Sequence, residues 1–159
     1  MLQDNQNISF AILNKLKQSS TKYVIETHEP VVTCQDVVRF LNVPLESIVK
    51  CIAFRSKLDH ICVAAIPGNR RVSVKKLEKV TGHHHLKMIP AAEVTNVLGI
   101  PLGAISPLSL PCGVILVIDR SLSDLEKIFM GTGDPCSSLI LNGRDLLNNT
   151  TGSIADITE

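Results

Sequence analysis

Residues 99–107 (GIPLGAISP) have the composition of a loop that could bind a ligand through its backbone. The stretch holds two glycines, two prolines and a serine, and only small or apolar residues lie between them. Glycine allows a backbone to approach a ligand closely, and proline fixes the geometry around it. Exposed N–H groups in such a turn can receive an oxygen that carries negative charge. The alternative is a packed connection between a helix and a strand.

Lys50 is the only charged residue in the interior of the apolar segment 48–55 (IVKCIAFR). Strand alternation places Lys50 on one face with Ile52 and Phe54, and Cys51 on the other. Both faces are apolar, which predicts a central strand covered on both sides. An ammonium there must find a partner, reach the surface or lose its proton easily. Lys50 is therefore either a residue that directs its charge into a site or a lysine that snorkels at a strand rim.

Positive charge is densest between residues 70 and 79, which include Arg70, Arg71, Lys75, Lys76 and Lys79. A patch of this kind can bind the phosphates of a polynucleotide, although it can also be the solvated face of a helix. The net charge of the whole chain is only +1, which argues against coating of nucleic acid. Docking of a single RNA end through a local patch remains compatible with that charge.

Other motifs that carry chemistry are missing from the sequence. The five cysteines form no C-x-x-C pair, so neither a zinc site nor a disulfide framework is expected, and a reduced, cytoplasmic setting fits. Residues 83–85 are three adjacent histidines, which cannot all face one metal from a regular element, and we expect an exposed linker. Glycine-rich nucleotide-binding motifs and nucleophile motifs are also absent. The sequence thus predicts no metal and no cofactor.

Apolar spacing and capping residues predict one α+β domain over residues 1–159. No signal peptide and no stretch of membrane-spanning length is found. Thr33 and Ser73 are predicted to cap the second and third helices. The expected helices are 8–19, 34–41, 74–81 and 91–98, and the expected strands are 22–27, 48–55, 61–66, 114–119, 127–130 and 138–142. Segments 48–55 and 61–66 are predicted to form a hairpin.

Seven short motifs follow one another from about Tyr23 to the end of the sequence. They are His28-x-Pro30, Ile48-Val49-Lys50, Pro67-Gly68-x-Arg70-Arg71-x-Ser73-x-Lys75-Lys76-Leu77, Gly103-x-x-Ser106-Pro107-Leu108, Gly131 with Gly133, Arg144-Asp145-Leu146 and Ala155-Asp156-Ile157. Each motif is weak alone, but their order and spacing are specific. In this set the sequence resembles the YbaK-type aminoacyl-tRNA deacylases, whose fold also forms the editing domain of bacterial prolyl-tRNA synthetases.

The resemblance implies a mixed, largely antiparallel sheet that curls toward a barrel, with short helices around it. It also implies an enzyme that hydrolyses the ester between a small, wrong amino acid and the 3′ end of a tRNA, with tRNA-Pro as the expected tRNA. Catalysis in the family is thought to use water or a group of the substrate. The expected partners are aminoacyl-tRNA and a prolyl-tRNA synthetase, without a membrane.

The resemblance assigns roles to three groups of residues. Lys50 and Gly103 are expected to be catalytic, the first at the terminal adenosine's phosphate or the developing charge and the second through its backbone N–H. The residues expected to bind tRNA are Arg70, Arg71, Lys75 and Lys76. Those expected to bind the aminoacyl group are His28, Cys51, Ile105, Ser106, Pro107, Gly131, Thr132, Gly133 and Ser138.

Several positions differ from the branches of the family with known amino acids. The cysteinyl-specific branch has Tyr-x-His where this chain has Glu26-Thr27-His28, and it has Thr after the lysine where this chain has Cys51. The alanyl-specific prolyl editing domains have a His in the region of Ser138. The resemblance therefore implies a deacylase without naming its amino acid. The alternatives are a module that binds charged tRNA or a synthetase without hydrolysis, and an amino-acid sensor.

Overall fold

The computed structural model describes the backbone of residues 2–159 and the side chains of residues 10–159. Within this part of the chain the strands form two sheets. The smaller has the order β1-β7-β6, from Val24–Thr27, Ser137–Leu141 and Ile128–Gly131. The larger has the order β4-β2-β3-β5-β8, from Lys87–Met88, Val49–Arg55, Ile61–Pro67, Ile115–Asp119 and Ser153–Ala155. The α+β class is confirmed, and the two sheets do not close into a barrel.

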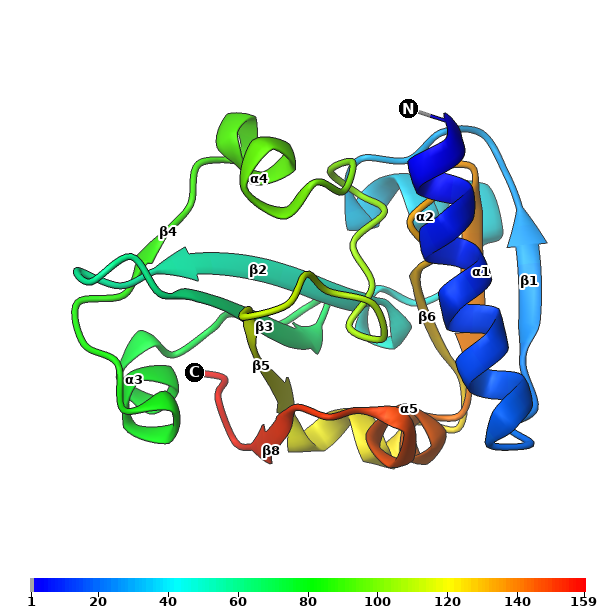
Figure 1. Cartoon of the computed structure of the whole chain (residues 1–159). Helices are drawn as coiled ribbons and strands as arrows, with labels where there is room; N and C mark the ends of the chain where they lie inside the picture. Colours follow the sequence, from blue (N-terminus) through cyan, green and yellow to red (C-terminus); the bar gives the residue numbers. More distant parts are fainter. Residues whose placement is uncertain (1) are drawn as a thin grey trace.

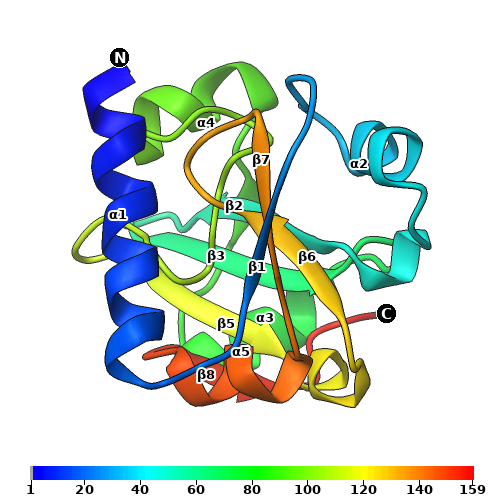
Figure 2. The ribbon, with the colours of Figure 1, turned by 90° about the vertical axis from the view of Figure 1, so that its right-hand side faces the viewer.

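The larger sheet combines two kinds of strand pairing. β2 and β3 form the predicted antiparallel hairpin, whereas β3 pairs with β5, and β5 with β8, in parallel. An isolated bridge between Ile48 and Phe129 joins the start of β2 to the smaller sheet. The strands of the smaller sheet run across those of the larger one (Figure 2).

β2 is less enclosed than the sequence predicts. It pairs with β3 along its whole length, but with β4 only at Phe54 and Arg55. The segment around Lys50 therefore has a strand neighbour on one side only within the sheet. On its other edge, the described chain has the bridge at Ile48 and the β4 pairs at Phe54 and Arg55, with no strand pair between them.

Three helices, α2, α3 and α4, have the predicted bounds, whereas α1 begins at Leu2, six residues before the predicted start at residue 8. Thr33 and Asp36 form the expected capping box of α2 (Cys34–Leu41), and Ser73 caps α3 (Val74–Thr81). Gly82 and Gly99, both with positive φ, end α3 and α4 (Ala91–Leu98). Positive φ costs glycine little, so these residues end helices without strain. α5 covers Gly143–Asn149 and is capped by Asn142, whose side chain accepts from Arg144 N–H.

α1 (Leu2–Gln18) is the longest helix of the described chain and lies along the smaller sheet (Figure 1). Its fully buried residues Ile12 and Leu16 belong to the core cluster that also contains Ile118 of β5, Met130 of β6 and Leu139 of β7. This core holds the two sheets together. It is aliphatic, as the absence of Trp and the low aromatic content predict.

Candidate active site

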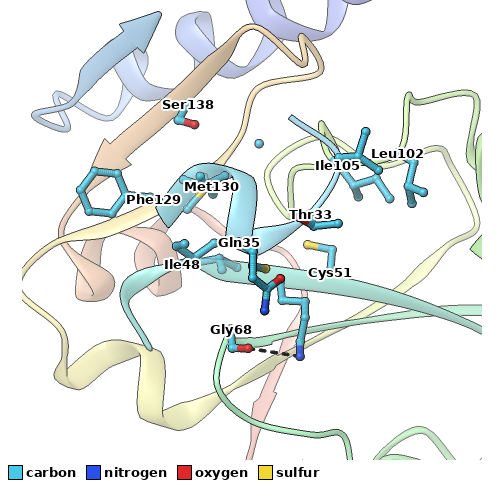
Figure 3. Close-up of a pocket in the computed structure, with 17 residues that line it drawn as sticks. Thr33, Gln35, Ile48, Cys51, Gly68, Leu102, Ile105, Phe129, Met130 and Ser138 are labelled. Atoms are coloured by element: carbon cyan, nitrogen blue, oxygen red, sulfur yellow. Dashed lines mark hydrogen bonds between the residues drawn. The ribbon is translucent and has the colours of Figure 1, made fainter. Parts of the chain in front are cut away.

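The two sheets and the segment before α2 enclose a pocket of about 320 Å³ (Figure 3). The chain contributes six stretches to it: the segment that leads into α2, the start of β2, Gly68 after β3, the loop after α4, and the strands β6 and β7. Its lining residues are Val32, Thr33, Cys34, Gln35, Val37, Ile48, Val49, Lys50, Cys51, Gly68, Leu102, Gly103, Ile105, Phe129, Met130, Gly131 and Ser138. Most are apolar, and Lys50 is the only charged residue among them.

Lys50 has no carboxylate partner among the described residues. Its Nζ donates to the carbonyl oxygens of Gly68 at 3.3 Å and Arg70 at 2.9 Å; the first bond is the dashed line of Figure 3. An ammonium has three N–H donors, so one stays available for a ligand. The two carbonyls fix the position of the charge without neutralising it.

Gly103 packs directly on the chain before α2. Its φ is +90°, and a Cβ at this position would lie 2.5 Å from the carbonyl oxygen of Val31. A similar contact occurs at Gly131, where a Cβ would lie 2.5 Å from the carbonyl oxygen of Ile105. These two close approaches hold the walls of the pocket together, since no side chain fits between them. Within the described chain, nothing accepts a hydrogen bond from the N–H of Gly103.

His28 and Ser138 form a hydrogen-bonded pair at the pocket. His28 Nε2 lies 2.7 Å from Ser138 Oγ, and His28 Nδ1 lies 2.7 Å from the carbonyl oxygen of Glu29. Phe40 of α2 stacks on the imidazole, with ring centroids 6.5 Å apart and ring planes within 9°. Ser138 is 4% exposed and lines the pocket, whereas His28 lies behind it.

The two thiols of the pocket are held in the neutral form. Burial, together with the smaller effect of the neighbouring Cys34, raises the pKa of Cys51 to about 12. Burial also raises the pKa of Cys34, against the opposing effect of Lys50. The thiolate is the nucleophilic form of cysteine, so these residues act as small apolar wall groups at neutral pH.

Asp36 shapes the wall that α2 contributes. Its carboxylate accepts hydrogen bonds from the N–H groups of Val32 at 2.9 Å and Thr33 at 3.0 Å. Hydrogen bonds from Thr33 and then Val32 lower the pKa of Asp36. The capping box therefore fixes the residues that pack on Gly103.

The predicted tRNA-binding residues differ in how free their charges are. Arg70, Arg71 and Lys75 are exposed, and the carbonyl of Arg70 is bonded to Lys50, so this loop adjoins the pocket. Lys76 instead donates to Asp156 Oδ2 and to the carbonyl of Thr158, both at 2.8 Å. Its charge is engaged by the C-terminal segment.

Five predicted substrate-binding residues lie outside the pocket lining: His28, which is bonded to Ser138, and Ser106, Pro107, Thr132 and Gly133. Ser106 is fully buried and accepts a hydrogen bond from Leu108 N–H, and Pro107 beside it is also buried. Thr132 is bonded to Ser137 Oγ, and Gly133 donates to the carbonyl of Ala104. Ser106 and Pro107 support the loop after α4, and Thr132 and Gly133 support the turn between β6 and β7, without lining the pocket. The others, Cys51, Ile105, Gly131 and Ser138, line the pocket together with Lys50 and Gly103.

The sequence did not indicate the wall formed by Val32, Thr33, Gln35 and Val37. The capping box predicted their helix but nothing in it indicated a ligand site. The close approach of Gly103 to Val31 and Val32 joins this segment to the pocket, and such a long-range contact leaves no local pattern.

Neither a metal site nor a membrane span emerges from the described residues. No group of three or more His, Cys, Asp and Glu side chains in this part of the chain is arranged to hold a metal ion. No helix described here combines the length and apolarity needed to cross a bilayer. Of the three adjacent histidines, His83 contacts the ring of His60, and His84 and His85 are exposed.

The chain is similar to known proteins over most of its length. The sequence profile of the aminoacyl-tRNA editing domain matches residues 28–148. The proline–tRNA ligase of Thermosipho africanus is 32% identical over 99 residues, which are 62% of this chain and 17% of the ligase. That of Polynucleobacter necessarius is 26% identical over 119 residues, 71% of this chain and 20% of the ligase. The chain thus spans about a fifth of these relatives.

Solved structures share the fold over nearly the whole chain. The hypothetical protein APE2540 is 25% identical with a TM-score of 0.84, covering 94% of this chain and 99% of the other. A protein described as a candidate trans-editing enzyme for prolyl-tRNA synthetase is 18% identical with a TM-score of 0.75, covering 96% and 97%. At 18% identity, the similarity to the second structure shows a shared fold only.

Proposed function

The chain belongs to the aminoacyl-tRNA editing domain family, and from this premise we propose that it is a deacylase that hydrolyses the ester of a small amino acid on a mischarged tRNA. The observation that carries the proposal is the arrangement of one fixed ammonium, Lys50, and one unpaired backbone N–H, Gly103, around a small and otherwise uncharged pocket in the described chain. An activated ester needs positioning and oxyanion stabilisation more than it needs a strong nucleophile.

In the proposed reaction, water attacks the ester carbonyl carbon. The carbonyl oxygen becomes negatively charged in the tetrahedral intermediate and accepts a hydrogen bond from the N–H of Gly103. The bond between the carbonyl carbon and the ribose oxygen then breaks. One proton of the attacking water ends on the ribose oxygen, the other is released to the solvent, and the amino acid leaves as a carboxylate.

Lys50 positions the RNA end in this proposal. Its ammonium is fixed by two carbonyls and keeps one donor for an anionic phosphate oxygen. The loop that supplies these carbonyls also carries Arg70 and Arg71, and Lys75 follows in α3. The exposed charges of these three residues are suited to phosphates further along the acceptor stem. Lys76, tied to Asp156, contributes less.

The tRNA and the partner are proposed from the relatives. The curated relatives above are proline–tRNA ligases, so we propose tRNA-Pro as the RNA and a prolyl-tRNA synthetase as the protein beside which this chain acts in the cytoplasm. The limited volume and apolar walls of the pocket favour a small, uncharged side chain.

The decisive experiment is a panel of mischarged tRNAs incubated with the purified protein, with loss of the ester followed over time. The expected result is turnover of at least one tRNA-Pro that carries a small wrong amino acid, and none of correctly charged prolyl-tRNA. Tight binding without turnover would instead support a module that recognises charged tRNA. Absence of both binding and turnover would reject the proposal.

A further inference from the structure

No carboxylate lines the pocket in the described part of the chain, although the proposed substrate carries a cation. Neither aspartate nor glutamate is among the lining residues given above. An aminoacyl ester has a free α-ammonium group, and this group must find hydrogen-bond acceptors when it leaves water. The acceptor therefore has to come from a neutral group of the pocket.

The His28–Ser138 pair provides such an acceptor. The carbonyl of Glu29 can only accept, so the neutral imidazole of His28 carries its proton on Nδ1. Nε2 is then an acceptor, and the hydroxyl of Ser138 donates its proton to it at 2.7 Å. With that proton committed, Ser138 Oγ has only lone pairs to offer the pocket.

The imidazole of His28 is held in place, so that Nδ1 stays the donor and Nε2 the acceptor. Phe40 stacks on its ring and the Glu29 carbonyl bonds its far nitrogen. Ser138 itself sits in the interior of β7, paired with Glu26 on one side and Gly131 on the other. The hydroxyl is thus both oriented and nearly inaccessible to bulk water, since Ser138 is 4% exposed.

The position of Ser138 also suits a cation. Figure 3 shows Ser138 and Gly68 at opposite ends of the pocket, and Lys50 is bonded at the Gly68 end. Two positive charges repel each other, most strongly where water is excluded. A substrate ammonium is therefore favoured at the Ser138 end, and the phosphate at the Lys50 end.

We propose that Ser138, held as a pure acceptor by His28, binds the α-ammonium group of the aminoacyl ester and so selects amino acids over hydroxy acids. This inference rests on the proposed function, to which it adds the orientation of the substrate. Ser138 and His28 also have the spacing of a nucleophile and its base. That role is disfavoured because a backbone carbonyl, and no carboxylate, would have to stabilise the imidazolium.

The test compares ligands that differ only at the α position. Binding of L-alaninamide and of L-lactamide, in which a hydroxyl replaces the ammonium, is followed by NMR titration at neutral pH. We expect wild type to prefer the ammonium by roughly ten- to a hundredfold, the range for a hydrogen bond to a charged group. Ser138→Ala should bind both amides alike. His28→Phe keeps the stacking on Phe40 but frees the Ser138 proton, and should reduce the preference.

Ser137→Ala is the matched control, because Ser137 neighbours Ser138 on β7 but lies outside the pocket lining and bonds Thr132. It should keep the wild-type preference. Equal binding of the two amides by wild type, or an unchanged preference in Ser138→Ala, would overturn the inference.

The same comparison is made with any tRNA ester that the protein hydrolyses and its α-hydroxy counterpart. Equal hydrolysis of both would reject the role of Ser138 and leave the deacylase intact. An acyl group trapped on Ser138 would make it a nucleophile and likewise reject the inference. If no ester is hydrolysed, the proposed function fails, and the amide titrations still decide the role of Ser138.

Discussion

Gly103 lies so close to Val31 that a Cβ on Gly103 would be 2.5 Å from the Val31 carbonyl oxygen and 2.7 Å from Val32 Cα. The contact joins the loop after α4 directly to the segment before α2, and both segments line the pocket. Gly103 is needed here for its missing side chain as well as for its φ of +90°. Any substitution therefore changes the shape of the pocket as well as its chemistry.

Replacement of Gly103 by Ala should destabilise the protein more than replacement of Gly113. Gly113 has nearly the same φ, +88°, but a Cβ there would meet nothing within 4 Å. Gly113→Ala is expected to cost about 1–2 kcal/mol from backbone strain alone. Gly103→Ala adds the clash with Val31 and should cost at least about 1 kcal/mol more, within the usual range for overpacking. Urea denaturation of both variants measures the difference. Equal destabilisation of the two would show that the loop after α4 moves enough to avoid the clash with Val31.

Local structure was predictable from the sequence because local chemistry determines it. The capping box at Thr33 and the Ser73 cap predicted where α2 and α3 begin, and the structure has both caps. The β2–β3 hairpin followed from two apolar runs and a five-residue turn. The parallel pairs β3–β5 and β5–β8, and the pairing of β1 with β7, depend on contacts between distant segments and were not predicted.

The site was predictable in part for the same reason. Lys50 and Gly103 were conspicuous as a charge in an apolar strand and a glycine in an apolar loop, and the structure places both at one pocket. Ser106, by contrast, was predicted to bind the aminoacyl group, but it is fully buried and does not line that pocket. The contribution of Val32 and Gln35 could not be foreseen, because it depends on how α2 packs against the loop.

Lys50→Met should remove deacylation while leaving the protein folded. Methionine retains the apolar stem but has no charge for a phosphate, and the expected loss of activity is a hundredfold or more, on the order of 3 kcal/mol for a charged hydrogen bond. Stability should fall by only about 1–2 kcal/mol, because Lys50 bonds two carbonyls and no buried carboxylate is left unpaired. Turnover rates and thermal denaturation are measured together.

Lys57→Met is the control for Lys50, since Lys57 is exposed in the turn between β2 and β3. Lys57→Met should change neither the turnover rate nor the thermal stability. Lys50→Arg should not restore activity, because a planar guanidinium does not replace a compact ammonium in a small pocket. Normal hydrolysis by Lys50→Met would exclude Lys50 from the site.

Binding of tRNA should depend on Arg71 and Lys75 more than on Lys76. A side chain that neutralises one phosphate contributes roughly 0.7–0.9 to the slope of log affinity against log salt, and its replacement should reduce the slope by that amount. Arg71→Gln and Lys75→Gln are each expected to show this change, whereas hydrolysis of small aminoacyl esters should stay at the wild-type rate. Filter binding over a salt series measures the slopes, and slopes equal to that of wild type would remove the exposed residues from the interface.

Lys76→Gln should act on the C-terminal segment instead. Lys76 lowers the pKa of Asp156, first by a hydrogen bond to its carboxylate and also by its charge. A carboxyl whose pKa is depressed on folding contributes stability above its unfolded pKa of about 3.8, and that contribution disappears as the pH falls through the lower folded value. The variant should therefore lose a little stability at neutral pH and none in strong acid, which denaturation at the two pH values tests.

The thiol of Cys51 should make the folded protein sensitive to alkali. Its pKa is raised on folding from 9.0 to about 12, so the native state keeps a proton that the unfolded state releases. The associated stability is complete below about pH 9 and is lost as the pH rises toward 12. Cys51→Ala should flatten this decline, whereas Cys112→Ala, at an exposed position, should not.

At pH 8, iodoacetamide should alkylate Cys112 before Cys51, because the thiolate is the reactive form. Rapid alkylation of Cys51 in the folded protein would show that a thiolate is available in the pocket, and a nucleophilic role for it would then have to replace the proposed attack by water.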